Sequence, residues 1–330
     1  MFTREQIEDR EYKTLAEGAA KAAGSRGRQR EEEKCDYRTD FQRDRDRIVH
    51  SKALRRLMHK TQVFIAPEED HFRTRLSHTL EVAQIARSIA RALGLNEDLT
   101  EAIAMGHDLG HTPFGHAGEL ALAAAHPGGF KHNIQSLRVC DVLESNAARR
   151  GMNLTEEVRD GILNHTGPEQ PFTLEGRIVK TADRIAYVNH DTDDALRSGI
   201  IREGELSANV VRLLGGTVSK RIDTLIRDMV GASAEAGDIC MSEDCWEAMD
   251  ELRSFLFDAV YMSKRVAADA KRYEIENLIP TLYKYYMLNP ENLPGEYQEL
   301  CEPYGLAEVV KDHIAGMTDR YARVTYLSVK

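Results

Sequence analysis

Apolar residues recur at helical spacing along most of the chain, and this periodicity is the feature that most constrains its fold. One run consists of Leu80, Val82, Ile85, Ile89 and Leu93, followed by the helix-ending residue Gly94. Similar apolar faces occur over residues 99–105, 134–143 and 178–186. Prolines number only 9 in 330 residues, and the sole candidate strand covers residues 61–66. We therefore expect an all-α protein.

Composition supports a folded chain and excludes several classes. Hydrophobic residues make up 42% and charged residues 30%, which is enough for a sizeable core. The formal net charge of −10 argues against a dedicated nucleic-acid binder. No apolar run approaches the roughly 20 residues of a membrane span, and residues 1–10 lack the apolar region of a signal peptide. The 5 scattered cysteines fit reduced thiols, so we expect a cytoplasmic protein.

The composition changes along the chain in a way that predicts three regions. Residues 1–35 are polar and rich in alanine, glycine and arginine, as expected of an N-terminal arm. Residues 36–200 carry most of the motifs described below and form the expected core. Residues 201–330 are again helical in pattern, and we expect them to pack on that core.

An arginine-rich segment stands out in this acidic chain. Between Arg26 and Lys60 there are 12 basic and 7 acidic residues. One interpretation is a charged helix whose arginines pair with neighbours or other subunits. A second is nucleic-acid binding, which the interleaved acids disfavour. A third is the border of a substrate or allosteric nucleotide pocket using Arg55 or Arg56, and we favour a mixture of the first and third.

The string Gly106-His107-Asp108-Leu109-Gly110-His111-Thr112-Pro113-Phe114-Gly115-His116 is the most informative segment. His107 and Asp108 are adjacent at the end of an apolar helix, and the glycines allow a turn that aims both at one centre. Thr112 and Pro113 have the pattern of an N-cap and the first residue of a new helix. On that helix, His116 would share a face with Glu119, three residues later.

Two more residues fit a metal centre with this pair. His78 lies on the apolar side of the preceding helix, so it should point inward, and Asp183 lies on the helix expected over 178–196. Two imidazoles and two carboxylates suit a divalent ion such as Mn, Mg, Fe, Co, Ni or Zn. The predicted metal ligands are therefore His78, His107, Asp108 and Asp183.

These residues resemble a known signature. The spacing His78 … His107-Asp108 … Asp183 is similar to that of the HD-domain metal-dependent phosphohydrolases. The string from His107 to Glu119 further resembles the deoxyguanosine triphosphate triphosphohydrolase (dGTPase) family and its dNTPase relatives. Matching stretches are Asp36-Tyr37-Arg38-Thr39-Asp40-Phe41-Gln42-Arg43-Asp44-Arg45-Asp46-Arg47, Lys60-Thr61-Gln62-Val63-Phe64 and Ala182-Asp183-Arg184-Ile185-Ala186-Tyr187. The resemblance implies an HD-domain helical bundle with additional C-terminal helices.

The resemblance also implies an activity, which is hydrolysis of a deoxynucleoside triphosphate between the 5′ oxygen and the α-phosphorus. The products would be a deoxynucleoside and inorganic tripolyphosphate. His116 would be the acid or base of the reaction, and Glu119 would orient it and hold its tautomer.

Six further residues would bind the substrate. They are Gln62, Arg75, His111, His132, Tyr187 and Asp191. Arg75 precedes His78 by one helical turn, and its planar guanidinium suits a phosphate. By resemblance, Tyr187 would pack on the deoxyribose, Asp191 would bond its 3′-hydroxyl and Gln62 would also face the sugar. Residues 164–167 end a helix and could approach the site, but we favour a capping role for them.

The remaining expectations concern partners and competing functions. The resemblance implies a homo-oligomer, often a hexamer, and an allosteric nucleotide is a further candidate partner at the arginine-rich segment. Alternatives are another HD-domain nucleotide phosphohydrolase, either a nucleotidase or a phosphodiesterase, and a non-catalytic binder of nucleotides or single-stranded nucleic acid. Base preference is left open, because base contacts can come from residues 201–330.

Overall fold

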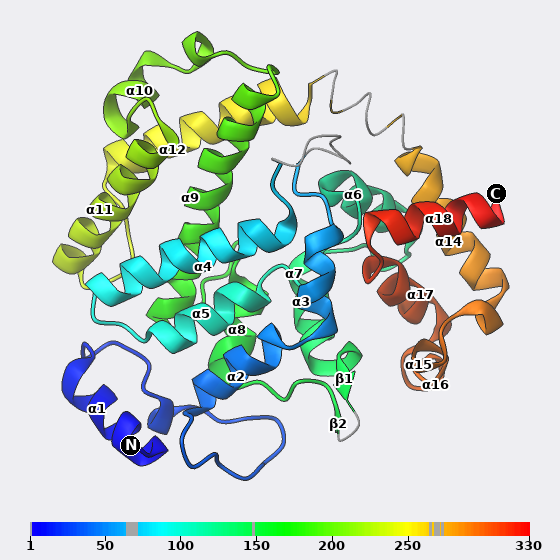
Figure 1. Ribbon diagram of the computed structural model, residues 1–330, viewed down its shortest axis with the longest axis horizontal. Coiled ribbons are helices and arrows are strands. Elements are labelled where there is room, and N and C mark those ends of the chain that lie inside the picture. Colours follow the sequence, from blue (N-terminus) through cyan, green and yellow to red (C-terminus); the bar gives the residue numbers. More distant parts are fainter. Residues whose placement is uncertain (1, 64–71, 147–148, 264–265, 267–270, 272–273) are drawn as a thin grey trace. The chain divides into compact units, whose positions relative to one another are not determined.

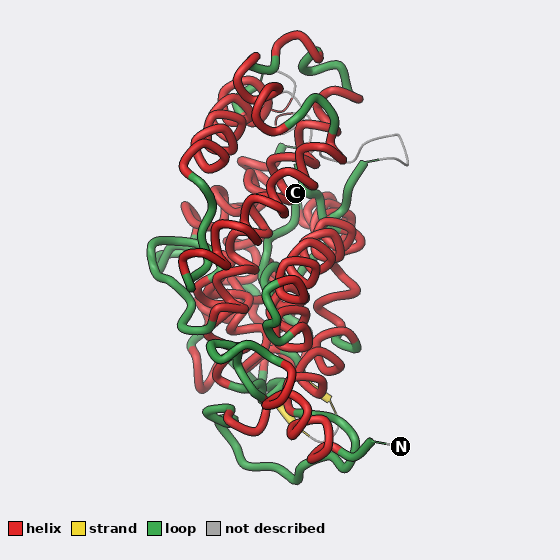
Figure 2. The backbone as a smooth tube through the Cα atoms, turned by 90° about the vertical axis from the view of Figure 1, so that its left-hand side faces the viewer, coloured by secondary structure: helices red, strands yellow, loops and turns green. Residues whose placement is uncertain are grey.

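The computed structural model describes residues 2–63, 72–146, 149–263, 266, 271 and 274–330. Most of this part of the chain is helical (Figure 2), which confirms the all-α prediction. The described strands form one small antiparallel ribbon of β1 (Ser145–Asn146) and β2 (Arg149–Arg150). Of the strand expected over 61–66, Thr61 forms an isolated bridge with Thr74. Phe64 and the two residues after it lie outside the described residues.

The chain divides into two compact units built from interleaved segments. Unit 1 comprises residues 1–50, 78–107 and 152–263, and unit 2 comprises residues 51–77, 108–151 and 264–330. The three regions predicted from the sequence, with boundaries after residues 35 and 200, follow one another along the chain and are a different division from these units. They stay a prediction. No helix in the described residues is long and apolar enough to cross a membrane.

Unit 1 contains the longest helices of the molecule (Figure 1). Its elements are α1 (Arg4–Thr14), α2 (Asp40–Val49), most of α4 (Arg75–Ala92), α5 (Glu97–Gly106), α8 (Glu156–Asn164), α9 (Leu174–Arg197), α10 (Ala208–Leu214), α11 (Val218–Ala236) and α12 (Glu243–Leu256), with short 3₁₀ turns at Ala22–Gly24 and Glu203–Glu205 and a π-helical turn at Phe257–Tyr261.

Helix α5 is central to the core of unit 1, where it packs on α2, α8 and α9. Its apolar residues Leu99 and Ile103 are fully buried. Two glycines bring α5 and α8 close together, because a Cβ at Gly106 would lie 2.4 Å from Ile162 Cδ1 and one at Gly161 would lie 2.6 Å from Ile103 Cδ1. This reciprocal packing sets the position of the end of α5.

The arginines near the start of unit 1 are paired within the chain. Arg28 is almost fully buried and forms an ion pair with Asp44, which has no exposed side-chain surface. Arg45 Nη1 lies 2.7 Å from Asp98 Oδ1, and Arg38 Nη1 lies 2.8 Å from Asp46 Oδ2. These contacts support the interpretation of the segment as an internally paired charged region.

Unit 2 consists of shorter helices. Its elements are α3 (Lys52–Arg56), α6 (Gly115–Ala125), α7 (His132–Arg138), the ribbon, α14 (Ile275–Leu288), α15 (Gly295–Gln298), α16 (Cys301–Tyr304), α17 (Leu306–Ala315) and α18 (Asp319–Val329), with 3₁₀ turns at Leu57–His59 and Pro290–Asn292 and a π-helical turn at Val139–Leu143.

Helix α14 organises the core of unit 2 by packing on α6, α17 and α18. Its buried residues Leu278, Ile279 and Leu282 join Leu122 of α6 and Val310 of α17 in one apolar cluster. The C-terminal helices and the helix that follows the histidine string therefore share one core.

The predicted start of α6 was wrong. We expected Thr112 as N-cap and Pro113 as the first residue, but α6 begins at Gly115 and its cap is Phe114, with φ of +62°. The Thr112 hydroxyl donates instead to the Gly115 carbonyl at 3.1 Å. The side chain of Phe114 belongs to the apolar cluster of unit 2, so tertiary burial overrode the local capping pattern.

Candidate active site

Unit 1 brings together three of the four predicted metal ligands, His78, His107 and Asp183. Each offers one donor atom, and the three atoms lie within 4.8 Å of one another. His78 Nε2 donates to Asp183 Oδ1 at 3.0 Å, and His107 Nε2 lies 3.8 Å from the same oxygen. The donors come from the start of α4, the residue after α5 and the middle of α9.

The hydrogen bonding of His107 suits a metal ligand. Its Nδ1 lies 2.6 Å from the carbonyl oxygen of Ala104. Because a carbonyl oxygen only accepts, Nδ1 donates in this bond, and Nε2 is the ring nitrogen that could ligate a metal. Two imidazoles and a carboxylate at this spacing fit a divalent transition metal or magnesium.

The electrostatics of this centre favour a negative carboxylate. Burial disfavours ionisation of Asp183, but the hydrogen bond from His78 and the nearby His107 outweigh it and lower the pKa of Asp183 to about 2. An ionised carboxylate beside buried imidazoles is the state that a cation requires of its ligands.

His165 also lies beside this centre, although we had favoured a helix-capping role for residues 164–167 over an approach to the site. Its ring centroid lies 5.1 Å from that of His107. Its Nδ1 donates to the carbonyl of Ile162 at 2.7 Å, so its Nε2 also has a lone pair. The sequence signal was weak, because a histidine just after a helix is usually a capping residue.

The two predicted sugar-binding residues of α9 lie one and two turns beyond Asp183. Burial and the charge of Asp183 raise the pKa of Tyr187 to about 12. Asp191 is buried and accepts a hydrogen bond from the hydroxyl of Tyr261, in the π-helical turn after α12. Tyr261 was absent from the prediction, since nothing in its local sequence points to a contact 70 residues away.

Unit 2 holds the fourth predicted ligand, Asp108, which follows His107 directly in the chain. Asp108 accepts a hydrogen bond from Arg75 Nη1 at 2.7 Å, and both side chains are nearly fully buried. The predicted phosphate-binding arginine therefore lies against a predicted metal ligand. The backbone N–H of Arg75 donates to the carbonyl of Lys60 at 3.2 Å, which ties the start of α4 to that residue.

Glu119 of α6 gathers three predicted site histidines of unit 2. It accepts hydrogen bonds from the backbone N–H and Nδ1 of His132, both at 3.0 Å. His111 Nε2 and His116 Nδ1 lie 3.7 and 3.9 Å from its other oxygen. Glu119 is thus closest to His132, whereas we had expected it to orient His116, whose side chain is 72% exposed.

These contacts separate the charge states of the histidines. The rings of His111 and His132 stack with centroids 4.9 Å apart. Burial, with the charge of Arg75, holds the pKa of His111 well below its usual value. Burial also disfavours the charged form of His132, but Glu119 outweighs it and raises the pKa of His132. The result is one neutral and one readily protonated imidazole, side by side.

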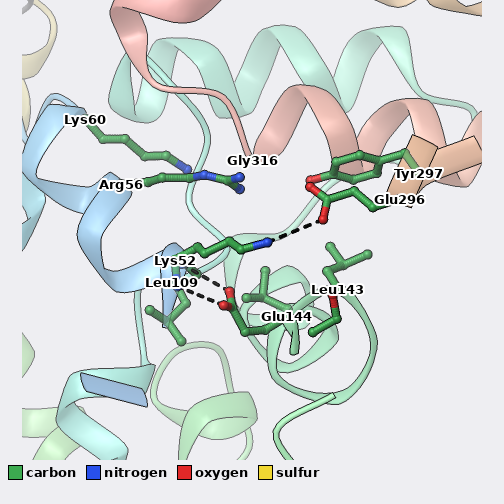
Figure 3. Close-up of a pocket in the computed structure, with 12 residues that line it drawn as sticks. Lys52, Arg56, Lys60, Leu109, Leu143, Glu144, Glu296, Tyr297 and Gly316 are labelled. Carbon is green, nitrogen blue, oxygen red and sulfur yellow. Dashed lines mark hydrogen bonds and ion pairs between the residues drawn. The ribbon is translucent and has the colours of Figure 1, made fainter. Parts of the chain in front are cut away.

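Gln62 and Arg56 were also predicted to border substrate or nucleotide. Gln62 Oε1 is buried and has no hydrogen-bond partner among the described residues. Arg56 borders a pocket of about 30 Å³ in unit 2, with room for one or two water molecules. Figure 3 shows Arg56 beside Lys60 and opposite Tyr297, with Lys52 reaching Glu296 at 3.5 Å.

Two family models match this chain. The HD domain family matches residues 75–188, and the phosphohydrolase-associated domain family matches residues 239–327. The first range includes the four predicted metal ligands, and the class of protein is that of the HD-domain phosphohydrolases.

Full-length relatives narrow the family. A deoxyguanosinetriphosphate triphosphohydrolase-like protein of Caldanaerobacter subterraneus subsp. tengcongensis is 54% identical over 329 residues, covering 100% of this chain and 96% of the relative. Proteins of the same description from Clostridium perfringens strain 13 and Desulfatibacillum aliphaticivorans are 48% and 46% identical, and each alignment covers at least 95% of both chains. The chain therefore belongs to the deoxyguanosinetriphosphate triphosphohydrolase-like family.

Proposed function

We propose that this protein hydrolyses a deoxynucleoside triphosphate to a deoxynucleoside and inorganic tripolyphosphate. The observation that carries the proposal is the cluster of His78, His107 and Asp183, in a chain 54% identical over its full length to a protein described as triphosphohydrolase-like. Asp108 is proposed as the fourth ligand because it is the next residue after His107.

A divalent ion held by these residues would supply a Lewis acid for an α-phosphate oxygen. The protein itself would supply the remaining positive charge. Arg75 presents a guanidinium that can donate to phosphate oxygens, and a protonated His132 would add a second donor. Neutral His111 can accept or donate one hydrogen bond beside them.

We propose His116 as the acid or base because its imidazole is 72% exposed and can reach a bound substrate. Glu119 Oε2 lies 3.9 Å from His116 Nδ1, so a small movement of either side chain would let it fix the tautomer. For the sugar, Tyr187 would cover the deoxyribose, Gln62 would offer its unpaired amide oxygen, and Asp191, held by Tyr261, would accept from the 3′-hydroxyl.

Product analysis is the direct test. We expect incubation with the four dNTPs, singly and in mixtures, and with several divalent metals to release tripolyphosphate and a deoxynucleoside. Ribonucleoside triphosphates should react more slowly if Tyr187 excludes the 2′-hydroxyl. Release of orthophosphate or a nucleoside monophosphate would instead favour a nucleotidase or phosphodiesterase, and tight dNTP binding without turnover would favour a non-catalytic binder.

Asp183→Ala tests the metal centre separately from the chemistry. Loss of the carboxylate should abolish both Mn²⁺ binding, measured by electron paramagnetic resonance, and turnover. His116→Ala should retain Mn²⁺ binding and lose about 10²–10⁴-fold in kcat, the usual contribution of general acid–base catalysis. Wild-type turnover by Asp183→Ala would show that the ligand assignment is wrong.

Three further expectations stay predictions. They are a homo-oligomer, for which the hexamer is one candidate form, an allosteric nucleotide, and a cytoplasmic location. Size-exclusion chromatography with light scattering, in the presence and absence of each dNTP, addresses the first two together.

A further inference from the structure

The turn before α6 contains a strained residue. Phe114 adopts φ of +62° and ψ of +26°, a left-handed conformation that is rare for a bulky side chain. Such a conformation is strained and persists only where surrounding contacts impose it. Because Phe114 lies two residues before His116, the contacts that impose this conformation also set the position of the His116 backbone.

Asp319, the first residue of α18, makes the polar contact that holds the turn. Its Oδ1 accepts the backbone N–H of Phe114 at 2.8 Å. Its Oδ2 accepts the backbone N–H of Thr61 at 3.0 Å and also the hydroxyl of Thr61. One carboxylate therefore joins the turn before His116 to the residue before Gln62.

Lys60 makes a second link, which joins the residue before Thr61 to the beginning of the turn and to the last residue of α17. It is buried, and its Nζ donates to the carbonyls of His111 and of Ala315, the latter at 2.8 Å. Lys60 thus holds the beginning of the turn at His111, while Asp319 holds its end at Phe114.

The turn also packs closely against the backbone of Gln62. Gly115 has φ of +57°, and a Cβ there would lie 3.0 Å from the carbonyl oxygen of Gln62. The backbones beside the proposed acid–base residue and the proposed sugar-binding residue are therefore almost in contact.

We propose that Asp319 is a positioning residue, which uses the C-terminal helix to fix the Phe114 turn and the Thr61–Gln62 backbone so that His116 and Gln62 are preorganised together. This inference rests on the proposed function for its kinetic consequence, but its structural part does not. It assigns a role to the phosphohydrolase-associated domain, which matches residues 239–327. Asp319 itself is half-buried, both of its carboxylate oxygens accept these hydrogen bonds, and we assign it no contact with substrate.

Asp319→Asn is the decisive variant because it is nearly isosteric. It replaces one acceptor oxygen with a donor amide, so either Phe114 or Thr61 loses its acceptor. We expect kcat to fall about 10- to 100-fold, as for a displacement on the order of 1 Å, with KM changed less than threefold. Hydrogen–deuterium exchange should become faster in peptides covering residues 59–63 and 109–117, while Mn²⁺ binding is retained.

Thr318→Ala is the matched control. Thr318 is the N-cap of the same helix and accepts the N–H of Tyr321 at 3.2 Å, so its loss weakens α18 without removing a contact to the turn. Its kcat should stay within twofold of the wild type. If both variants lose kcat equally, Asp319 acts only by stabilising α18. If Asp319→Asn shows wild-type exchange and wild-type kcat, Asp319 does not hold the turn. Either result overturns the proposal.

A second variant covers the case in which Asp319→Asn does not fold. Thr61→Val removes the hydroxyl and keeps the backbone N–H, so it should cause a smaller loss of kcat and faster exchange at the same peptides. Wild-type kcat and exchange in Thr61→Val would then overturn the proposal. A wild-type protein that hydrolyses no dNTP overturns the proposed function instead, and the exchange data still decide whether Asp319 orders the turn.

Discussion

Gly106→Ala should destabilise the protein although alanine is the better helix former. A Cβ at this position would lie 2.4 Å from Ile162 Cδ1, 2.9 Å from Ile162 Cγ1 and 3.3 Å from Ile48 Cδ1. Non-bonded carbons prefer about 3.5–4.0 Å, so Ile162 Cδ1 must retreat by more than 1 Å. Both isoleucines are fully buried, which leaves no solvent-facing direction for that movement.

The magnitude follows from two opposing terms. Overpacking of a well-filled core costs about 1–3 kcal/mol. Replacing glycine by alanine within a helix stabilises the folded state by up to about 1 kcal/mol, and by less at Gly106 because it is the last residue of α5. We therefore expect a net loss of about 1–2 kcal/mol, seen as a melting temperature lowered by a few degrees in calorimetry.

A double-mutant cycle tests the stated contact. Ile162→Val removes Cδ1, the atom in the worst collision, and alone should cost about 0.5–1.5 kcal/mol. In the Gly106→Ala background it should cost nothing or restore stability, with a coupling of about 1 kcal/mol. Because His107 follows Gly106, the single variant should also bind Mn²⁺ more weakly, and the double variant should recover part of that affinity.

Gly231→Ala is the control for helix propensity. Gly231 lies inside α11, and a Cβ there would meet nothing within 4 Å. It should stabilise the protein by up to about 1 kcal/mol. If Gly106→Ala proves as stabilising as Gly231→Ala, or if Ile162→Val fails to compensate, the close packing of α5 and α8 is not what holds this position.

Two further predictions concern buried charges. Asp44→Ala leaves the buried Arg28 without its closest carboxylate. We expect the free energy of unfolding to fall by about 3 kcal/mol, the lower end for a broken buried pair, because Asp40 also lies 3.3 Å from Arg28. Chemical denaturation measures this change, and a loss below about 1 kcal/mol would refute the prediction. Burial raises the pKa of Glu175 to about 7 although its Oε1 accepts the N–H groups of Ala20 and Asn96, so its contribution to stability is full below about pH 4.5 and is lost as pH rises through 7. Glu175→Gln should therefore flatten the dependence of unfolding free energy on pH between about 4.5 and 7, and an unchanged slope would contradict the assignment.

Helical periodicity was sufficient to predict much of the fold. The run beginning at Leu80 became α4, and Gly94 after it has φ of +68°. The periodicity did not determine which neighbours each face would meet, and Leu80 is 50% exposed although it belongs to that run. Apolar spacing indicates which residues tend to be buried, whereas burial itself depends on which distant elements pack against the helix.

The candidate site divides in the same way. The string around His107 and Asp108 predicts a metal centre because adjacent donors at a flexible helix end are a local property. Asp183 was found only through helical spacing and family resemblance. Tyr261 and His165 were not assigned a role, because their relevance depends on contacts with Asp191 and His107 that local sequence does not encode.

The sequence by itself determined the helical class, and it predicts the metal-ligating residues and the chemistry they can support, since these depend on side-chain type and short-range spacing. Only the tertiary structure decided how the site residues are held. Phe114 replaced Thr112 as the cap of α6 because its ring entered the core and Asp319, 205 residues later, accepted its N–H. A local pattern offers a turn several conformations of similar energy, and long-range contacts choose among them.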